Sequence, residues 1–322
     1  GATKNYVGAV RASSDPSRHK LIIGPWLHSV NRDRVIGERD FGPESIIELD
    51  ALRDAWLDHV MLGAPAPDQP NVRYFVQGSN VWKSATAWPL PDTRFTDYHL
   101  ASGGHANTLL GDGELRRGAP ADGPPDGFTY DPADPVPTMS SRTAGSRSGI
   151  PAGSVDNRAV ETRQDVLVYT TEPLREGVEV TGPVTATIHF ETDVPDTDIT
   201  VKLLDVSPDG KALNLTHGVA RAKYRESYAE PKPLETGVIY ELEVELFPTS
   251  NYFEAGHRIR IEVSSSNFPL FARNLNTMDS DTGVEMRQAH TRIHHTPEHP
   301  SRITLPIVPN GVATDDGERG RR

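Results

Sequence analysis

Cysteine is absent from all 322 residues of the sequence. This absence excludes disulfide frameworks, thiolate zinc sites and cysteine nucleophiles, and it leaves the redox compartment open. Basic residues are outnumbered by acidic ones, which gives a formal net charge of −12. Because nucleic acids and anionic membranes attract basic surfaces, we expect neither of them as a partner.

Long apolar runs are missing as well. No segment approaches the length of a membrane-spanning helix, and the opening GATKNYVGAV lacks the basic-then-apolar order of a signal peptide. We therefore expect no membrane association and favour the cytoplasm. Since Gly1 is an unusual natural start, we also expect a chain that is processed, recombinant or cut from a longer one.

The first part of the chain has the pattern of an α/β fragment. Residues 1–10 predict a short helix, and the apolar run at 20–23 predicts a buried strand of a parallel sheet covered on both faces. Apolar residues recur at helical spacing over 45–63, where Gly63 can end the helix. The segment APAPDQP at 64–70 then breaks the pattern as a linker. We assign residues 1–66 to this unit.

The second part changes to short strand patterns with no helices between them. Strands are predicted at 72–78, 96–104, 166–171, 178–192, 198–215, 239–247 and 257–266, with turn or loop signals at 208–210 and 251–257. This order predicts an antiparallel β-sandwich over residues 70–309. Residues 111–165 look irregular, which is unusual unless they are functional or packed on a neighbour. We expect 310–322 to be a disordered tail.

One histidine stands where chemistry is expected. His28, in GPWLHS, follows a predicted parallel strand, where α/β folds place ligands and catalytic groups. In α/β-hydrolases the catalytic histidine lies on a loop after a late strand and before a closing helix, which matches this placement. On spacing alone, a loop histidine with local hydrogen bonds is the better interpretation.

Three other motifs fit plainer interpretations. No G-x-S-x-G occurs, and GSRSG at 145–149 has Arg147 at its centre, so no serine nucleophile is recognisable. RIHHTPEHP at 292–300 has metal-ligating residue types, but H-E-x-x-H is missing and Pro297 interrupts a helical display, which favours a polar loop. DVPDTD at 193–198 lacks the EF-hand order, which favours a turn. We expect no metal and no cofactor.

Many ordered segments carry a family resemblance. They are KLIIGPWLHS, DAWLDHVMLG, VRYFVQGSNVWKSATAWPLPDT, FTYDPADPVPT, DTDITVKLLDVSPDGKALNLTHGVARAKYRE and PTSNYFEAGHRIRIEVSSSNFP. Together they resemble the cocaine esterase / X-prolyl dipeptidyl peptidase family of serine hydrolases, almost to the end of the chain. The resemblance implies an α/β-hydrolase domain, a helical cap and a C-terminal jelly-roll (galactose-binding-like) β-sandwich. It also implies hydrolysis of esters or amides by a Ser-His-Asp triad.

The resemblance also implies roles for particular residues. His28 falls on the catalytic histidine, whereas the serine and the aspartate of the triad would precede Gly1. Residues 139–153 fall on a loop that reaches the substrate pocket, although the aromatic expected there is missing. The candidate pocket residues are therefore Trp26, Thr143 and Ile150.

The partners follow from the same resemblance. We expect two partners, a small ester or peptide substrate and the N-terminal catalytic portion of the same enzyme. A homodimer is a further alternative that the sequence leaves open. Alone, this chain is expected to be inactive, because triad residues act as a unit. Without the rest of its sheet, the strand at 20–23 leaves residues 1–64 poorly held. The alternatives are a non-catalytic sandwich that braces the hydrolase domain or binds carbohydrate, and a separate chain that supplies the serine and aspartate.

Overall fold

The computed structural model describes residues 1–120, 122–140 and 149–309, so the predicted tail at 310–322 lies outside the described residues. The helices are α1 (Ala2–Ala12), α2 (Leu49–Leu62) and α3 (Arg158–Glu161), with 3-10 turns at Pro16–Arg18, Pro43–Ser45 and Ala222–Tyr224. Among the described residues, no helix combines the length and the apolar character that a membrane span requires.

The strands dominate the described chain. They are β1 (Leu21–Ile23), β2 (Val35–Ile36), β3 (Arg39–Asp40), β4 (Val72–Val76), β5 (Val81–Ala85), β6 (Arg94–Ala101), β7 (Glu114–Arg117), β8 (Asp126–Tyr130), β9 (Leu167–Thr170), β10 (Val178–Thr192), β11 (Asp198–Val206), β12 (Ala212–Arg221), β13 (Tyr240–Phe253), β14 (Arg258–Ser264), β15 (Ala289–His294) and β16 (Arg302–Val308). The predicted mainly β architecture is confirmed.

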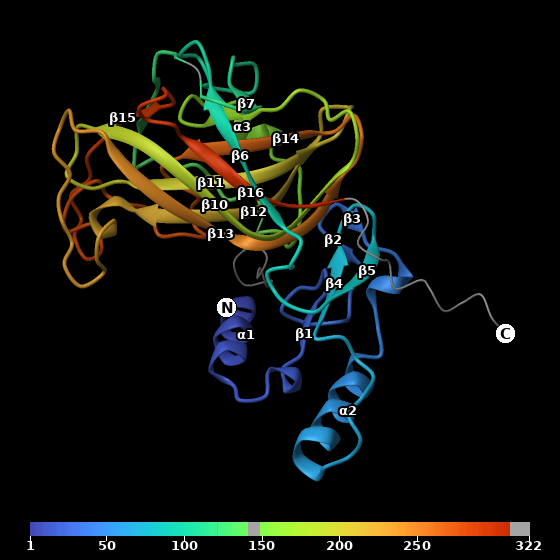
Figure 1. The fold of residues 1–322 in the computed structure, drawn as a ribbon. Coiled ribbons are helices and arrows are strands. Elements are labelled where there is room, and N and C mark those ends of the chain that lie inside the picture. The colour runs from blue at the N-terminus through green and yellow to red at the C-terminus, as the bar shows by residue number, and fades with distance from the viewer. Residues whose placement is uncertain (121, 141–148, 310–322) are drawn as a thin grey trace.

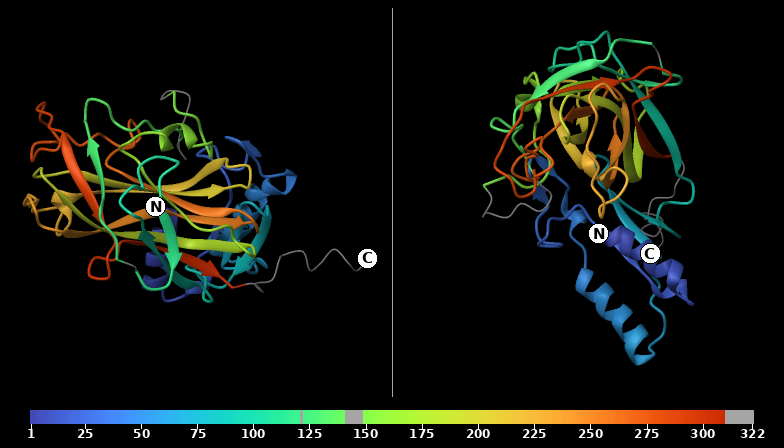
Figure 2. Two further views of the ribbon diagram at one scale, coloured as in Figure 1. Left: turned by 90° about the horizontal axis from the view of Figure 1, so that it is seen from above. Right: turned by 90° about the vertical axis from the view of Figure 1, so that its left-hand side faces the viewer.

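Eleven strands form one sheet that curls back on itself. Their order is β13-β12-β11-β14-β9-β7-β6-β16-β10-β15-β8, and β13 also pairs with β10, which closes a barrel-like sandwich (Figure 1). Apart from one parallel contact between β7 and β9, its strand pairs are antiparallel, as predicted. An end-on view shows the strands surrounding a common interior (Figure 2).

Alternation of side chains explains why β13 packs as it does. Leu242, Val244 and Leu246 are buried in the interior, while the glutamates between them are exposed. By contrast, every residue of β11 is buried, so both of its faces are covered.

The long connection before β9 is bound to the sheet at β14. Asn157 donates to Glu262 at 2.9 Å, and Arg260 donates to Glu161 at 2.7 Å, so α3 and its flanks are bound to β14. The region 111–165 is thus packed on a neighbour, but it is less irregular than predicted, because it also contains β7, β8 and α3.

The N-terminal elements lie beside the sandwich rather than within it. A second sheet joins β1 in parallel to β4, and β4 antiparallel to β5. In Figure 1 and in the right-hand view of Figure 2, α2 projects away from the sandwich, and none of its residues is buried. The predicted linker at 64–70 is irregular, yet the strand pair β1–β4 crosses it, so the two predicted units share a sheet.

Several predicted boundaries are corrected by the structure. The helix predicted from residue 45 begins at Leu49, because Pro43–Ser45 forms a 3-10 turn first, while Gly63 ends it in the left-handed conformation as predicted. The predicted loop at 251–257 is wrong in its first half, since β13 continues to Phe253. Strand β1 is partly exposed at Ile22 and Ile23, which differs from the predicted full burial.

Candidate active site

The loop that carries His28 is fastened on both sides. On one side, the Trp26 indole donates to the Ser45 carbonyl at 2.7 Å. On the other, the Asn31 side chain donates to the Ile47 carbonyl at 2.6 Å and accepts from the Ile47 amide at 2.9 Å. Both anchors lie on the segment leading into α2, so the loop is held in a fixed position between them.

The sequence around Trp26 explains the crowding in GPWLHS. A Cβ at Gly24 would lie 2.4 Å from the Trp26 ring, so only glycine leaves room for the indole to fold back. The ring then packs 5.7 Å from Trp82, whose own ring lies 5.4 Å from Phe75. Trp26 therefore has a structural role in an aromatic cluster and also faces the cavity described below.

His28 itself is exposed, five residues past the end of β1. Its imidazole makes no hydrogen bond or ion pair with any residue that the structure describes. The alternative of a loop histidine with local hydrogen bonds is therefore not what is observed. The His28 ring is therefore open to solvent on a loop that Trp26 and Asn31 fasten.

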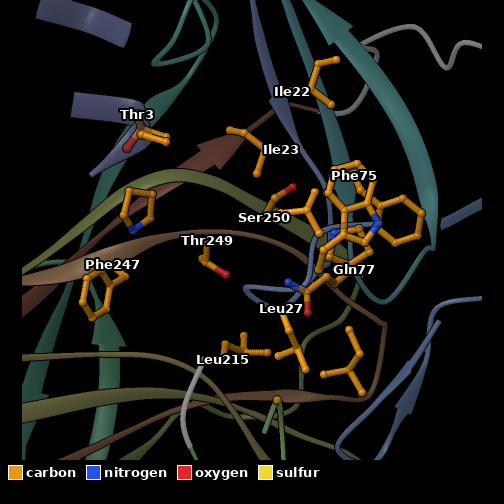
Figure 3. Close-up of a pocket in the computed structure, with 18 of the residues that line it drawn as sticks. Thr3, Ile22, Ile23, Leu27, Phe75, Gln77, Leu215, Phe247, Thr249 and Ser250 are labelled. Atoms are coloured by element: carbon orange, nitrogen blue, oxygen red, sulfur yellow. The ribbon is translucent and has the colours of Figure 1, made fainter. Parts of the chain in front are cut away.

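A cavity of about 400 Å³ opens beside this loop, between the N-terminal elements and the sandwich. Its walls include Ile22, Ile23, Trp26, Leu27, Phe75, Gln77, Leu215, Phe247, Thr249 and Ser250, most of which Figure 3 shows around a common space. Trp26, Leu27 and Val30 line it, so the loop of His28 forms one edge of the cavity. This size lies within the range of small-molecule sites.

A buried ion pair holds the hairpin β2–β3 against the sandwich. Arg39, on β3, donates to Asp205 at 3.1 Å and to the Asn251 side chain at 2.7 Å. The opposite oxygen of Asp205 binds His257 at 2.7 Å. The hairpin β2–β3, whose Ile36 lines the cavity, is therefore attached to β11 and β13.

The predicted pocket loop is placed only in part. Ile150 is half-buried and is not among the cavity residues, whereas the neighbouring Gly153 and Ser154 are. The Ser154 carbonyl accepts from the Glu38 amide at 2.8 Å, which docks this end of the loop on the hairpin β2–β3. Thr143 lies outside the described residues.

A Ser–His–Asp cluster does exist, but its geometry is not catalytic. Ser102 Oγ lies 3.1 Å and Asp126 Oδ2 lies 3.3 Å from the same nitrogen of His295, and Ser102 donates directly to Asp126 at 2.6 Å. A catalytic histidine bridges serine and carboxylate through two different nitrogens. The side chains of His295 and Asp126 are also completely buried, so substrate has no access.

The Asp126 carboxylate is the anchor of that cluster. Burial opposes its charge, but hydrogen bonds from His295, Ser102, the Ala106 amide and Tyr169 together outweigh burial and lower its pKa. A carboxylate that accepts several hydrogen bonds at the meeting of β8, β9 and the β15–β16 connection stabilises the fold. The cluster is therefore structural.

The two motifs that resembled metal sites are accounted for by other contacts. Within the described residues, no group of three or more potential ligands has the geometry to hold a metal ion. The first three residues of the segment 292–300 are strand, since β15 extends to His294, which corrects the predicted loop.

In DVPDTD, at 193–198, basic side chains of the same chain lie beside two of the aspartates. Asp198 accepts from Arg221 at 2.9 Å, and Lys223 Nζ lies 3.9 Å from Asp196. Burial raises the pKa of both aspartates despite these partners.

Sequence reasoning missed the sandwich wall of the cavity. Thr249, Leu215 and Gln77 are brought together from three distant strands or strand ends. No local pattern distinguishes them from other strand residues, because only the closed topology makes them neighbours.

Comparison with known proteins agrees with this architecture. Residues 66–304 match a family model described as the X-Pro dipeptidyl-peptidase C-terminal non-catalytic domain. The chain is also similar to the cocaine esterase of Rhodococcus sp. (strain MB1 Bresler), with 42% identity over 306 residues that cover 92% of this chain and 53% of the esterase.

Two solved structures resemble the chain. An aminopeptidase from a marine sediment Thaumarchaeota archaeon has a TM-score of 0.80 and 31% identity, covering 90% of this chain and 49% of that one. An α-amino acid ester hydrolase has a TM-score of 0.75 and 29% identity, covering 89% and 50%. The chain thus spans about half the length of the relatives that it matches.

Proposed function

The chain belongs to the family of cocaine esterase and the X-Pro dipeptidyl peptidases, and from this membership we propose that it is part of a serine hydrolase, contributing the histidine of a Ser-His-Asp triad. In this proposal His28 is the base and residues 1–66 are the end of an α/β-hydrolase domain. The jelly-roll sandwich at 70–309 braces that domain and walls its substrate cavity. The observation that supports it best is the exposed imidazole on a loop fastened by Trp26 and Asn31.

The chemistry assigns His28 two proton transfers. It accepts the proton of a serine hydroxyl as that oxygen attacks the ester or amide carbonyl, and then donates it to the leaving alcohol or amine. An aspartate that orients the ring and the serine itself would come from the N-terminal catalytic portion. The apolar side chains of the cavity exclude water from the bound substrate.

Complementation tests this proposal. The chain alone should not hydrolyse a p-nitrophenyl ester. Joined to the portion of the Rhodococcus cocaine esterase that the alignment leaves uncovered, it should gain saturable esterase activity. That activity should fall at least about a thousandfold in His28→Ala, since triad residues act together.

The matched control is His19→Ala, which removes a half-buried histidine of the same N-terminal segment and should keep the activity. Activity that survives His28→Ala in the joined protein would remove His28 from the mechanism. Saturable activity of the isolated chain would contradict the division of the triad between the two portions.

A second candidate function is carbohydrate binding by the sandwich. One observation favours it: Tyr224 and Tyr228 stack with ring centroids 5.6 Å apart, and Tyr228 is 89% exposed. Exposed aromatic faces are suited to stacking on sugar rings. Calorimetric titration with galactose and cellobiose, repeated on Tyr228→Ala, should show binding only if this candidate is correct.

A further inference from the structure

The cavity beside His28 differs in charge from the rest of the chain. Asp, Glu, Lys and Arg make up 24% of the sequence, yet none of them lines the cavity among the described residues. Within the described lining, the groups that can carry a charge are the α-amino group of Gly1 and the side chain of His217, which is buried between Phe247 and Phe271 at ring distances of 5.5 Å.

We propose that this cavity binds an uncharged acyl or alkoxy group of an ester substrate and rejects groups that carry an ammonium. The proposal rests on the proposed function, which makes the cavity part of a hydrolase site. Its physical basis is desolvation. An ion that enters an apolar cavity loses its hydration, and without an opposite charge in the wall this loss is not recovered.

The polar groups that do face the cavity suit a neutral ligand. The Thr249 hydroxyl and the Gln77 amide make no side-chain hydrogen bond with any described residue, and both face the cavity, as Figure 3 shows. A hydroxyl and an amide can each donate to a carbonyl, ether or ester oxygen. Leu27 and Phe75 provide the apolar contacts around them.

The fit is one of size as well as polarity. A cavity of about 400 Å³ accommodates a single aromatic or branched acyl group with its ester linkage. Trp26 and Leu27 line it and His28 lies next in the chain, so the loop of the proposed base borders the cavity.

The test uses two ligands that differ by one charge. Methyl 3-phenylpropanoate is neutral, whereas phenylalanine methyl ester carries an ammonium below the pKa of its amine. Trp26 and Trp88 line the cavity, so tryptophan fluorescence reports binding to the purified chain. The neutral ester should bind at least about tenfold more tightly than the ammonium ester, because nothing in the wall replaces the water of the ion. Equal affinity, tighter binding of the ammonium ester, or binding of neither ligand would overturn the proposal.

A charge-swapped variant locates the site. Gln77→Glu is isosteric and adds one carboxylate to the wall, so it should shift the preference toward the ammonium ester by at least about tenfold. Gln164→Glu makes the same change at an exposed position outside the cavity and should leave the preference unaltered. An unchanged preference in Gln77→Glu would place binding elsewhere.

His28→Ala separates this proposal from the proposed function. His28 is not among the cavity residues, so ligand binding should persist in this variant whether or not the histidine is catalytic. Loss of the neutral-ester preference therefore counts against the cavity assignment, whereas loss of complemented activity reports on the triad.

Discussion

Single residues in this protein have roles that their immediate surroundings make explicit. Gly24 is required by the ring that folds over it, and Asn31 is required by two hydrogen bonds to one neighbour. Each of these contacts positions the loop of His28 without touching His28 itself. Substitutions at this scale therefore separate the placement of the histidine from its chemistry.

The first prediction compares two glycines. Gly24→Ala should destabilise the protein by about 1–3 kcal/mol, because the new Cβ overlaps the Trp26 ring and displaces it from Ser45. Gly8→Ala, in the exposed interior of α1 with open space around it, should stabilise that helix by about 1 kcal/mol. Urea unfolding followed by tryptophan fluorescence measures both. A Gly24→Ala variant as stable as the parent would show that the indole has another place to go.

The second prediction concerns a buried carboxyl. Burial and the nearby Glu262 raise the pKa of Glu161 from 4.5 to about 7. The folded state therefore holds a proton that the unfolded state releases between these values. The free energy of unfolding should then fall as pH rises from 4.5 to about 7.

This decline should be smaller in Glu161→Gln, which cannot titrate. Glu176→Gln, at an exposed position, should retain the decline of the parent protein. Urea unfolding midpoints of the parent and both variants, measured across this pH range, test the prediction. Parallel profiles for the parent and Glu161→Gln would show that Glu161 keeps its ordinary pKa in the folded protein.

At the scale of elements, attachment of the hairpin β2–β3 matters more than its length. Each of its strands has two residues, so its own hydrogen bonds contribute little. Its position depends on Arg39, whose side chain is 11% exposed and is bound to Asp205 and Asn251.

The third prediction removes that attachment. Arg39→Met should cost about 3 kcal/mol, because among the described residues it leaves the buried Asp205 side chain with only the His257 ring as a side-chain partner. Arg53→Met, which removes an exposed pair with Asp50 on α2, should cost less than about 1 kcal/mol. Chemical denaturation gives both values. Similar costs would mean that the hairpin is held by apolar packing alone.

How well the sequence predicts the fold differs from one helix or strand to the next. Strand β10 was predictable to its ends because β-branched and apolar residues recur on both sides of Gly182-Pro183, and α2 because Gly63 marks its end. The short strands β7 and β8 were missed because they lie in a segment rich in proline and glycine.

The candidate site was predictable to a similar degree. His28 could be found because it follows a strand and matches a family motif. Thr249 and Gln77 could not be found in this way. They line the cavity because the closed sheet brings distant strands together, and no neighbouring residue in the sequence signals that position.

At the scale of the whole molecule, stability is unevenly shared. The sandwich contains eleven paired strands, whereas β1 has three residues and α2 buries none of its side chains. All four tryptophans, at 26, 56, 82 and 88, precede the sandwich strands that begin with β6. Tryptophan fluorescence therefore reports the N-terminal elements, and far-UV circular dichroism mainly reports the sandwich.

The fourth prediction follows from this distribution. Urea should change tryptophan fluorescence at a lower concentration than it changes the circular dichroism, because the N-terminal elements have the smaller core. Coincident transitions would instead show that the two parts unfold as one cooperative unit.

The parallel pair β1–β4 has a practical consequence for anyone dividing this molecule. A cut in the irregular segment 64–70 looks natural, yet it would separate two strands that share backbone hydrogen bonds and would leave β4 with an open edge. A cut between β5 and β6, near residue 90, breaks no strand ladder among the described residues, apart from the two isolated bridges Gln77–Asn251 and Gly37–Ser154. The seam of the protein therefore lies about twenty residues beyond the place where its sequence changes character.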